Sequence, residues 1–145
     1  MKIMKTKKVK TPERVGKNAG IDFFIPSDFK NYILKPKESI IIESGIKVRL
    51  PDNHCLIAFN KSSISLNNII IGACVIDENY TGQLHFNLIN VGSTFFELKA
   101  NQKIVQFILI KQNYYKIEEY YDEKELYKNF NIKERGENGF GSTNK

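Results

Sequence analysis

The chain has 145 residues, of which 41% are hydrophobic and 26% are charged, and its formal net charge is +6. This length is typical of one domain, since domains commonly have about 100–200 residues. A chain of this size can bury a sizeable core without disulfides or metals. The hydrophobic fraction is too high for a disordered chain, and no apolar run reaches the roughly 18 residues of a transmembrane helix. The Lys-rich start lacks the apolar segment of a signal peptide, so we expect a protein that is not secreted and has no membrane partner.

The net positive charge at first suggests a protein that binds nucleic acid. However, only three of the 22 basic residues are Arg, namely Arg14, Arg49 and Arg135. Arg is the residue that reads guanine edges and holds phosphates bidentately. The Lys residues are spread along the chain, and Lys, Asn and Ile, all abundant here, share A/T-rich codons. We therefore attribute most of the charge to genome composition and do not expect a nucleic-acid partner.

The cysteines and histidines exclude several kinds of site. Cys55 and Cys74 are far apart and do not form a Cys-x-x-Cys pair, which favours two reduced thiols in a reducing compartment. His54 and His85 are the only histidines, and no cluster offers the three or four ligands that a zinc site needs. A Ser-His-Asp triad has no support, because the Gly-x-Ser-x-Gly turn is missing.

The predicted elements divide the chain into a basic N-terminal arm (1–18), a body (19–131) and a Gly-rich tail (132–145), all within one domain. In the body, the run 69–76 is continuously apolar, which predicts one buried strand. In the run 84–88, apolar and polar residues alternate, as in a strand with one buried face. The predicted strands, in chain order, cover 21–25, 39–50, 54–59, 69–76, 84–88, 95–98 and 104–110.

Many short strands separated by turn signals predict an all-β sandwich or barrel. The acidic and aromatic segment 114–130 fits either a short helix or an irregular strand. The tail contains Gly136, Gly139 and Gly141, which disfavour regular structure. Such a tail is either disordered or orders around an anion, because Gly-rich backbone can present several N–H groups to it.

Five short segments combine a charged, hydroxyl or amide group with small neighbours. Lys61 stands beside two hydroxyls, a set of donors that suits phosphate oxygens. Asp77 and Tyr80 share one turn after an apolar run. Taken singly, each segment has a structural explanation, such as a turn, a helix cap or a Gln paired with backbone. The segments are 19–22, 60–63, 75–82, 105–106 and 135–143.

Read in this order, the segments resemble the five motifs of the trimeric dUTP pyrophosphatases, or dUTPases. The segment 135–143 matches the family tail motif Arg-Gly-x-x-Gly-Phe-Gly-Ser-Thr at every fixed position. The resemblance implies a β jelly roll and a homotrimer with active sites between subunits. It also implies that water attacks the α-phosphate of dUTP, with Mg²⁺ on the triphosphate, giving dUMP and pyrophosphate. This activity limits uracil in DNA and supplies dUMP for dTMP synthesis, in the cytoplasm, or in the nucleus or host cell for a viral protein.

The resemblance also implies a role for each matching position. Asp77 corresponds to the carboxylate that deprotonates the attacking water, and Gln106 to a glutamine that contacts the phosphates beside it. Tyr80 corresponds to the platform under the deoxyribose, and Asp22 to the acidic residue that supports the metal through water. The remaining implied contacts are Cys74, Val75 and His85 around uracil, Lys61, Ser62 and Ser63 on the phosphates, Phe140 stacked on uracil, and Arg135, Gly141, Ser142 and Thr143 over the γ-phosphate end.

Asn101 and Gln102 replace a usual Gly-Asp before the fourth motif, which we expect to alter only a turn, and three positions of the implied site also depart from the family pattern. Lys61 replaces an Arg, which keeps the charge and loses the planar fork. Cys74 replaces a Gly, which is tolerated provided that its φ is negative. His85 also replaces a Gly, which is tolerated if its side chain points outward.

Two alternatives to a dUTPase remain open at this point. The first is an enzyme of the dCTP deaminase type, which shares the fold. The intact segment 135–143 favours the dUTPase over it. The second is a catalytically weak regulatory protein that acts by binding partners. The presence of both Asp77 and Tyr80 disfavours this reading.

Overall fold

The computed structural model describes residues 1–129, and it divides the chain into two compact units, 1–113 and 114–145. The predicted site residues of the tail, which are Arg135, Phe140, Gly141, Ser142 and Thr143, lie outside the described residues. No helix among the described residues is long and apolar enough to span a lipid bilayer.

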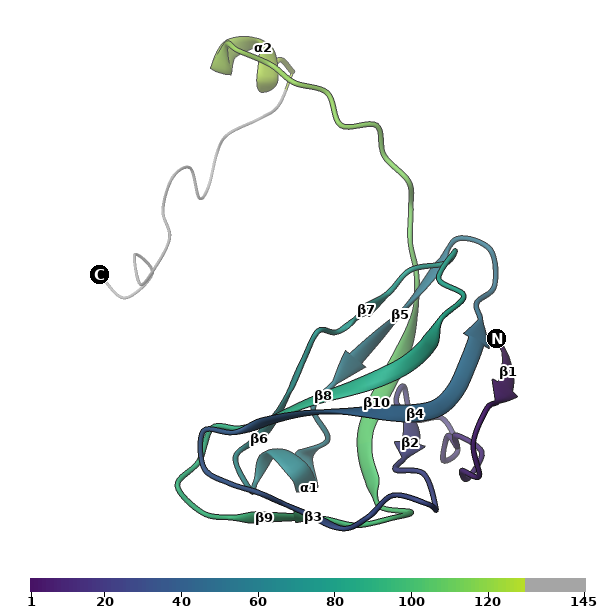
Figure 1. The fold of residues 1–145 in the computed structure, drawn as a ribbon. Coiled ribbons are helices and arrows are strands. Elements are labelled where there is room, and N and C mark those ends of the chain that lie inside the picture. Colours follow the sequence, from purple (N-terminus) through teal and green to yellow (C-terminus); the bar gives the residue numbers. More distant parts are fainter. Residues whose placement is uncertain (130–145) are drawn as a thin grey trace. The chain divides into compact units, whose positions relative to one another are not determined.

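Unit 1–113 is built from ten strands and one short helix (Figure 1). They are β1 (Lys2–Lys5), β2 (Ile21–Phe24), β3 (Tyr32–Leu34), β4 (Ser39–Arg49), β5 (His54–Phe59), α1 (Ser62–Ser65), β6 (Ile69–Gly72), β7 (Val75–Ile76), β8 (Gln83–Asn90), β9 (Phe96–Leu98) and β10 (Lys103–Lys111).

The strands form two four-stranded sheets and one small pair, and every pairing is antiparallel. The first sheet has the order β1-β4-β8-β6, the second β2-β10-β5-β7, and the pair is β3-β9. Strands that are distant in sequence are neighbours in both sheets, so the chain crosses repeatedly from one sheet to the other. This arrangement confirms the predicted all-β jelly roll.

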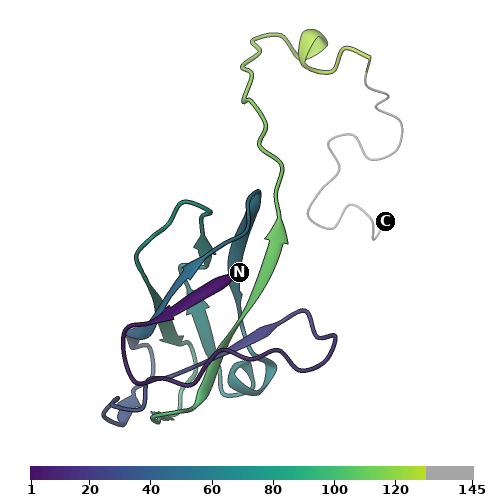
Figure 2. The same ribbon diagram turned by 90° about the vertical axis from the view of Figure 1, so that its right-hand side faces the viewer.

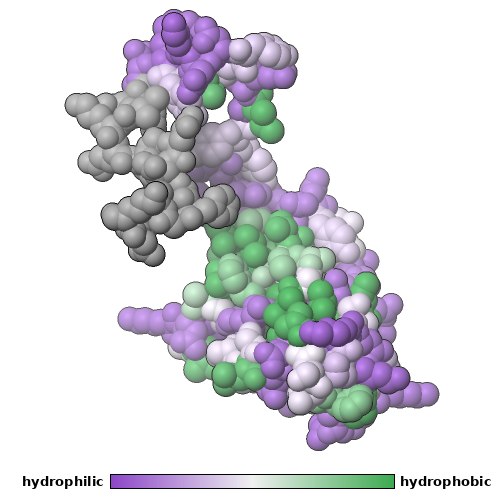
Figure 3. All heavy atoms as spheres, turned by 90° about the vertical axis from the view of Figure 1, so that its left-hand side faces the viewer, coloured by the Kyte–Doolittle hydropathy of each residue, from purple (hydrophilic) through white to green (hydrophobic). Residues whose placement is uncertain are grey.

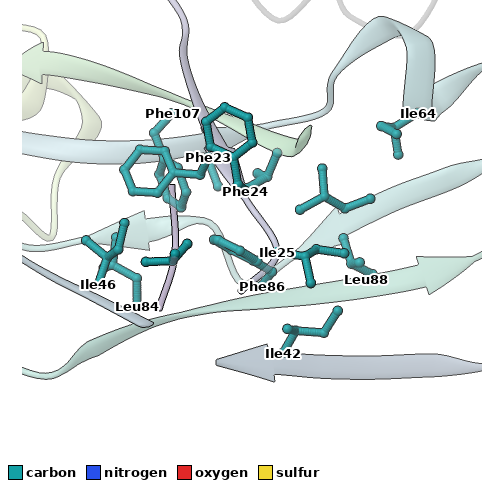
Figure 4. Close-up of a cluster of buried hydrophobic side chains, with 14 of the residues drawn as sticks. Phe23, Phe24, Ile25, Ile42, Ile46, Ile64, Leu84, Phe86, Leu88 and Phe107 are labelled. Carbon is teal, nitrogen blue, oxygen red and sulfur yellow. The ribbon is translucent and has the colours of Figure 1, made fainter. Parts of the chain in front are cut away.

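Three phenylalanines join the two sheets in the core (Figure 4). Phe23 and Phe107 come from the second sheet, and their ring centroids lie 4.7 Å apart. Phe86 comes from β8 of the first sheet and lies 6.4 Å from each of them. Tilted and edge contacts of this kind are the favoured geometries for aromatic rings. The predicted alternation in β8 is confirmed, because positions 84, 86 and 88 are buried.

The run 69–76 does not form the single buried strand that its apolar sequence predicts. It contains β6, which pairs with β8 in the first sheet, and β7, which pairs with β5 in the second. Between them the chain crosses at Ala73, whose φ of 46° lies in the left-handed region. Several of its side chains face outward, and Val75 is 60% exposed. The prediction of one buried strand, which rested on apolar composition alone, is therefore wrong for this run.

The segment predicted as a basic arm is partly built into the first sheet. Strand β1 (purple in Figure 2) pairs with β4 at the sheet edge. Ile3 packs against the core and Val9 is buried. An ion pair of 2.5 Å between Lys7 and Glu43 holds the same segment. Ile3 and Val9 are not recognisable as core residues from the sequence, because lysines surround them in the segment 1–18.

The described part of the second unit, 114–129, contains one short helix, α2 (Glu123–Leu126). The side chain of Asp122 caps this helix by accepting a hydrogen bond from the backbone N–H of Lys124 at 2.9 Å. Of the two structures that the sequence allowed for this segment, the short helix is therefore the one that forms. Ile117 and Tyr121 are more than nine-tenths exposed.

Candidate active site

Three predicted residues line one cavity of about 380 Å³ at the edge of the second sheet. Asp22 on β2 and Gln106 on β10 are directly opposite each other in the strand register. Lys61 follows the end of β5 and precedes α1. Ser62 and Ser63 begin α1 next to Lys61 and are exposed, but they do not line this cavity. We call this the Gln106 cavity.

The carboxamide of Gln106 is held from both sides. Its Nε2 donates a hydrogen bond to the backbone carbonyl of Asn60 at 2.8 Å. Its Oε1 lies against Gly20, where a Cβ would come within 2.3 Å of this oxygen. Only glycine leaves room for the amide in this orientation. The second hydrogen on Nε2 is still available to a ligand, because an NH₂ group carries two donors.

Charged side chains surround the carboxylate of Asp22 in the same cavity. Lys61 Nζ lies 2.9 Å from one carboxylate oxygen and Lys103 Nζ lies 3.4 Å from the other. Lys103 also pairs with Glu13. The hydrogen bond to Glu13, reinforced by Asp22, raises the pKa of Lys103 above its ordinary value. An anion that binds Lys61 must therefore compete with Asp22 for it.

Five other predicted residues line a second cavity of about 480 Å³. This is the Asp77 cavity, and its predicted residues are Cys74, Val75, Asp77, Tyr80 and His85.

The ring of Tyr80 has a fixed place at this cavity. Its hydroxyl donates to the backbone carbonyl of Gln83 at 2.9 Å. The ring also lies on Gly82, where a Cβ would come within 2.3 Å of the hydroxyl oxygen. The absence of a side chain at Gly82 is therefore a condition for this ring position.

The two substitutions for glycine near the predicted base site are accommodated differently. Cys74 does not have a positive φ, unlike its neighbour Ala73. The requirement that the φ of Cys74 be negative is therefore met. His85 is exposed on β8, as the alternation predicts, but it still lines the Asp77 cavity. Its place in the register is opposite Glu43 of β4.

The two cavities lie far apart within one chain. Gln106 is opposite Phe59 at one end of β5, whereas β7 on the other side of β5 brings Asp77 level with Cys55. A strand rises about 3.3 Å per residue and neighbouring strands lie about 4.8 Å apart, so Asp77 and Gln106 are separated by about 16 Å. One chain therefore does not bring the two groups of residues together.

An apolar surface separates the two cavities. The register aligns Val75, Ile57 and Ile108 in one row across β7, β5 and β10. Phe59, the next outward residue of β5, is 41% exposed. From the side on which β6 and β7 lie in Figure 1, hydrophobic side chains form a continuous area (Figure 3). Exposed apolar areas of this kind commonly mark contacts with another molecule.

Sequence reasoning missed three residues that position the predicted ones. Gly20 and Asn60 lie inside singled-out segments but received no role. Lys103 lies outside the singled-out segments. No sequence signal distinguishes them, because their contacts depend on how distant strands pair.

Comparisons with known proteins agree with this picture. The dUTPase family model matches residues 7–144. The chain is 34% identical over 127 residues to the deoxyuridine 5'-triphosphate nucleotidohydrolase of fowlpox virus, covering 87% of this chain and 83% of the relative. It is 30% identical over 131 residues to the Pol polyprotein of equine infectious anemia virus, covering 90% of this chain but only 11% of that much longer protein.

A solved structure has the same fold. It is a mutant dUTPase of Staphylococcus bacteriophage 80alpha with dUpNHpp, and it superposes with a TM-score of 0.81 at 20% identity, covering 98% of this chain and 96% of the phage protein. The family match spans nearly the whole chain and includes both cavities. This chain belongs to the dUTPase family.

Proposed function

We propose that this chain is a dUTP diphosphatase that hydrolyses dUTP to dUMP and pyrophosphate. One observation carries the proposal: the predicted site residues within 1–129 group around two chemically different cavities. Asp22, Lys61 and Gln106 provide charge and an amide suited to phosphates. Asp77 and Tyr80 provide a base and an aromatic platform suited to a nucleoside.

In the proposed mechanism, Asp77 accepts the proton of the water that attacks the α-phosphorus. Asp77 is exposed just after β7, where a carboxylate can reach a water molecule directly. The free N–H of Gln106 donates to a phosphate oxygen beside this water. The ammonium of Lys61 leaves the carboxylate of Asp22 and binds the phosphates, where it offsets the negative charge that develops on them.

The proposed uracil site uses backbone groups of β7 and its surroundings. Val75 pairs with β5 on one side only, because β7 is the last strand of its sheet among the described residues. Its other edge can present N–H and C=O groups to the base. We propose that Cys74, Val75 and His85 read uracil in this way. Cytosine would leave some of these groups unpaired, which a buried site strongly disfavours.

Residues of the tail complete this proposal, although they lie outside the described part of the chain. Phe140 stacks on uracil, while Arg135, Gly141, Ser142 and Thr143 close over the γ-phosphate. A chain that ends at residue 131 would then bind dUTP weakly and hydrolyse it slowly, because closure both orients the substrate and excludes water. A truncated chain with wild-type kcat/KM would contradict this role.

The separation of the two cavities supports the proposal of a homotrimer with active sites between subunits. A second copy that covers the row of Val75, Ile57 and Ile108 would bring its own residues next to each cavity. Ile57→Glu places a charge in this row and should give inactive monomers in sedimentation experiments. Ile41→Glu is the matched control, because Ile41 is 67% exposed on the other sheet. A wild-type chain that sediments as an active monomer would refute the proposal.

The residues of the Gln106 cavity fit Mg²⁺ that is held mainly by the substrate. Within residues 1–129, no three His, Cys, Asp or Glu side chains converge on one point. Proteins commonly hold Mg²⁺ with one or two carboxylates together with water and substrate phosphates. Asp22 would support its water shell, and the ion would supply positive charge to the triphosphate. Asp22→Asn should therefore raise the Mg²⁺ concentration needed for half-maximal activity.

The decisive assay incubates the protein with dUTP and dCTP and measures pyrophosphate and ammonia. The proposed function is supported if pyrophosphate forms from dUTP and not from dCTP. This activity would limit uracil in DNA and supply dUMP in the cytoplasm, nucleus or host cell. Ammonia from dCTP would instead identify a deaminase. Asp77→Asn should abolish hydrolysis while leaving dUTP binding intact, because it removes the base and preserves the shape. Full activity of this variant would overturn the mechanism.

A further inference from the structure

Asn60 connects the Gln106 cavity with the strand that leads to the Asp77 cavity, although it lines neither cavity. Its backbone carbonyl accepts the hydrogen bond from Gln106 Nε2 at 2.8 Å. Its side-chain Oδ1 accepts a hydrogen bond from the backbone N–H of Ile71 at 2.7 Å. The first contact belongs to the Gln106 cavity. The second belongs to β6, two residues before the crossing that lines the Asp77 cavity.

The crossing from β6 to β7 has few other attachments. It leaves β8 at Gly72, passes Ala73 with its positive φ, and reaches β5 through a hydrogen bond from Ala58 N to Cys74 O of 2.8 Å. Strand β6 is the last of its sheet among the described residues. The N–H of Ile71 therefore meets the side chain of Asn60 instead of a further strand. This end also has a weak contact of 3.9 Å from Cys74 Sγ to the Ile71 carbonyl, and Ile71 and Cys74 pack against the core. Without the Asn60 acceptor, β6 would keep backbone hydrogen bonds only to β8.

We propose that Asn60 is a positioning residue whose side chain fixes the β6–β7 crossing and thereby the base-reading edge of the Asp77 cavity. The inference rests on the proposed function for its substrate. The two contacts of Asn60 are separable, since a side-chain substitution removes Oδ1 and preserves the backbone carbonyl. Loss of the side chain should therefore disturb nucleoside recognition and leave the orientation of Gln106 unchanged.

The size of the effect follows from one hydrogen bond. A neutral hydrogen bond commonly contributes about 1 kcal/mol, so Asn60→Ala should raise the KM for dUTP roughly threefold to tenfold. Inhibition by dCTP should become stronger relative to wild type, because a looser crossing distinguishes the two bases less well. The kcat should stay close to wild type, because Gln106 keeps its acceptor.

The experiment compares Asn60→Ala with Asn60→Asp, whose carboxylate still offers an oxygen to Ile71. Asn31→Ala is the control, because Asn31 is an exposed asparagine before β3 with no hydrogen bond in the described structure. The readouts are the KM and kcat for dUTP, inhibition by dCTP, and hydrogen exchange of the Ile71 amide. Asn60→Ala should raise KM and speed exchange at Ile71. Asn60→Asp and Asn31→Ala should behave like wild type.

Two outcomes would overturn the inference. One is an Asn60→Ala protein with wild-type KM and wild-type protection of Ile71. The other is equal impairment of the Ala and Asp variants, which would mean that the acceptor is irrelevant. If Asn60→Ala does not fold, Asn60→Ser serves instead, since its hydroxyl is one bond too short to reach Ile71. A wild-type protein that does not hydrolyse dUTP would refute the proposed function, whereas exchange at Ile71 would still test the contact.

Discussion

Replacing Gly20 by alanine should impair chemistry far more than stability. The new Cβ would lie 2.3 Å from Gln106 Oε1, whereas ordinary contact begins near 3.4 Å, so the amide must move by about 1 Å. A misplacement of about 1 Å at a reacting site can reduce the rate about 100-fold, which corresponds to about 2.7 kcal/mol of transition-state stabilisation. The free energy of unfolding should change by less than about 1 kcal/mol, because the displaced atom ends a flexible side chain and Gly20 has no positive φ.

The assay measures kcat/KM for dUTP and the melting temperature of Gly20→Ala, Gln106→Ala and the double variant. The clash requires the Gln106 side chain, so Gly20→Ala should cause no further loss of activity once Gln106 is alanine. Additive losses would refute the reasoning. So would a Gly20→Ala enzyme with wild-type kcat/KM, because it would show that the amide tolerates displacement.

Three further predictions concern other parts of the molecule. Gly82→Ala should raise the KM for dUTP about tenfold in steady-state assays, because a Cβ there would lie 2.5 Å from Tyr80 Cζ in a rigid ring. Lys61→Arg should preserve or raise turnover, since the guanidinium adds a planar fork, and a loss of more than about tenfold in kcat/KM would contradict the assigned role. The hydrogen bond from Lys7 lowers the pKa of Glu43 below its usual 4.5. The pair therefore stabilises the attachment of β1 above that pH and is lost as the pH falls through the lowered pKa. The protection factors of the β1 amides, which correct for the slower intrinsic exchange in acid, should then fall as the pH is lowered, and pH-independent protection would contradict the contact.

Period-two alternation allowed much of the fold to be predicted from the sequence. In β8, burial of one face leaves alternating apolar residues that can be read directly. The run 69–76 gave the wrong answer for a physical reason. Apolar residues appear wherever water is excluded, and the sequence does not say whether the protein's own core or another chain excludes it. Within this run Ile69 is buried in the protein's own core, whereas Val75 is 60% exposed.

The candidate site was predictable where residues act through fixed spacing along the chain. Asp77 and Tyr80 are three residues apart on one turn, so their proximity is local. The pairing of Asp22 with Gln106 depends on the register of β2 against β10, which no local pattern reveals. The role of Asn60 depends on a crossing between sheets that the sequence presents as one continuous strand.

The distance between the two cavities has a genetic consequence. If neighbouring chains complete each site, a chain that carries Asp77→Asn and a chain that carries Gln106→Ala are each inactive as pure oligomers. Co-expressed, they assemble some interfaces in which the intact Gln106 of one chain meets the intact Asp77 of another. Two null alleles of this gene would then restore activity to each other, which two defects confined to one self-contained chain cannot do.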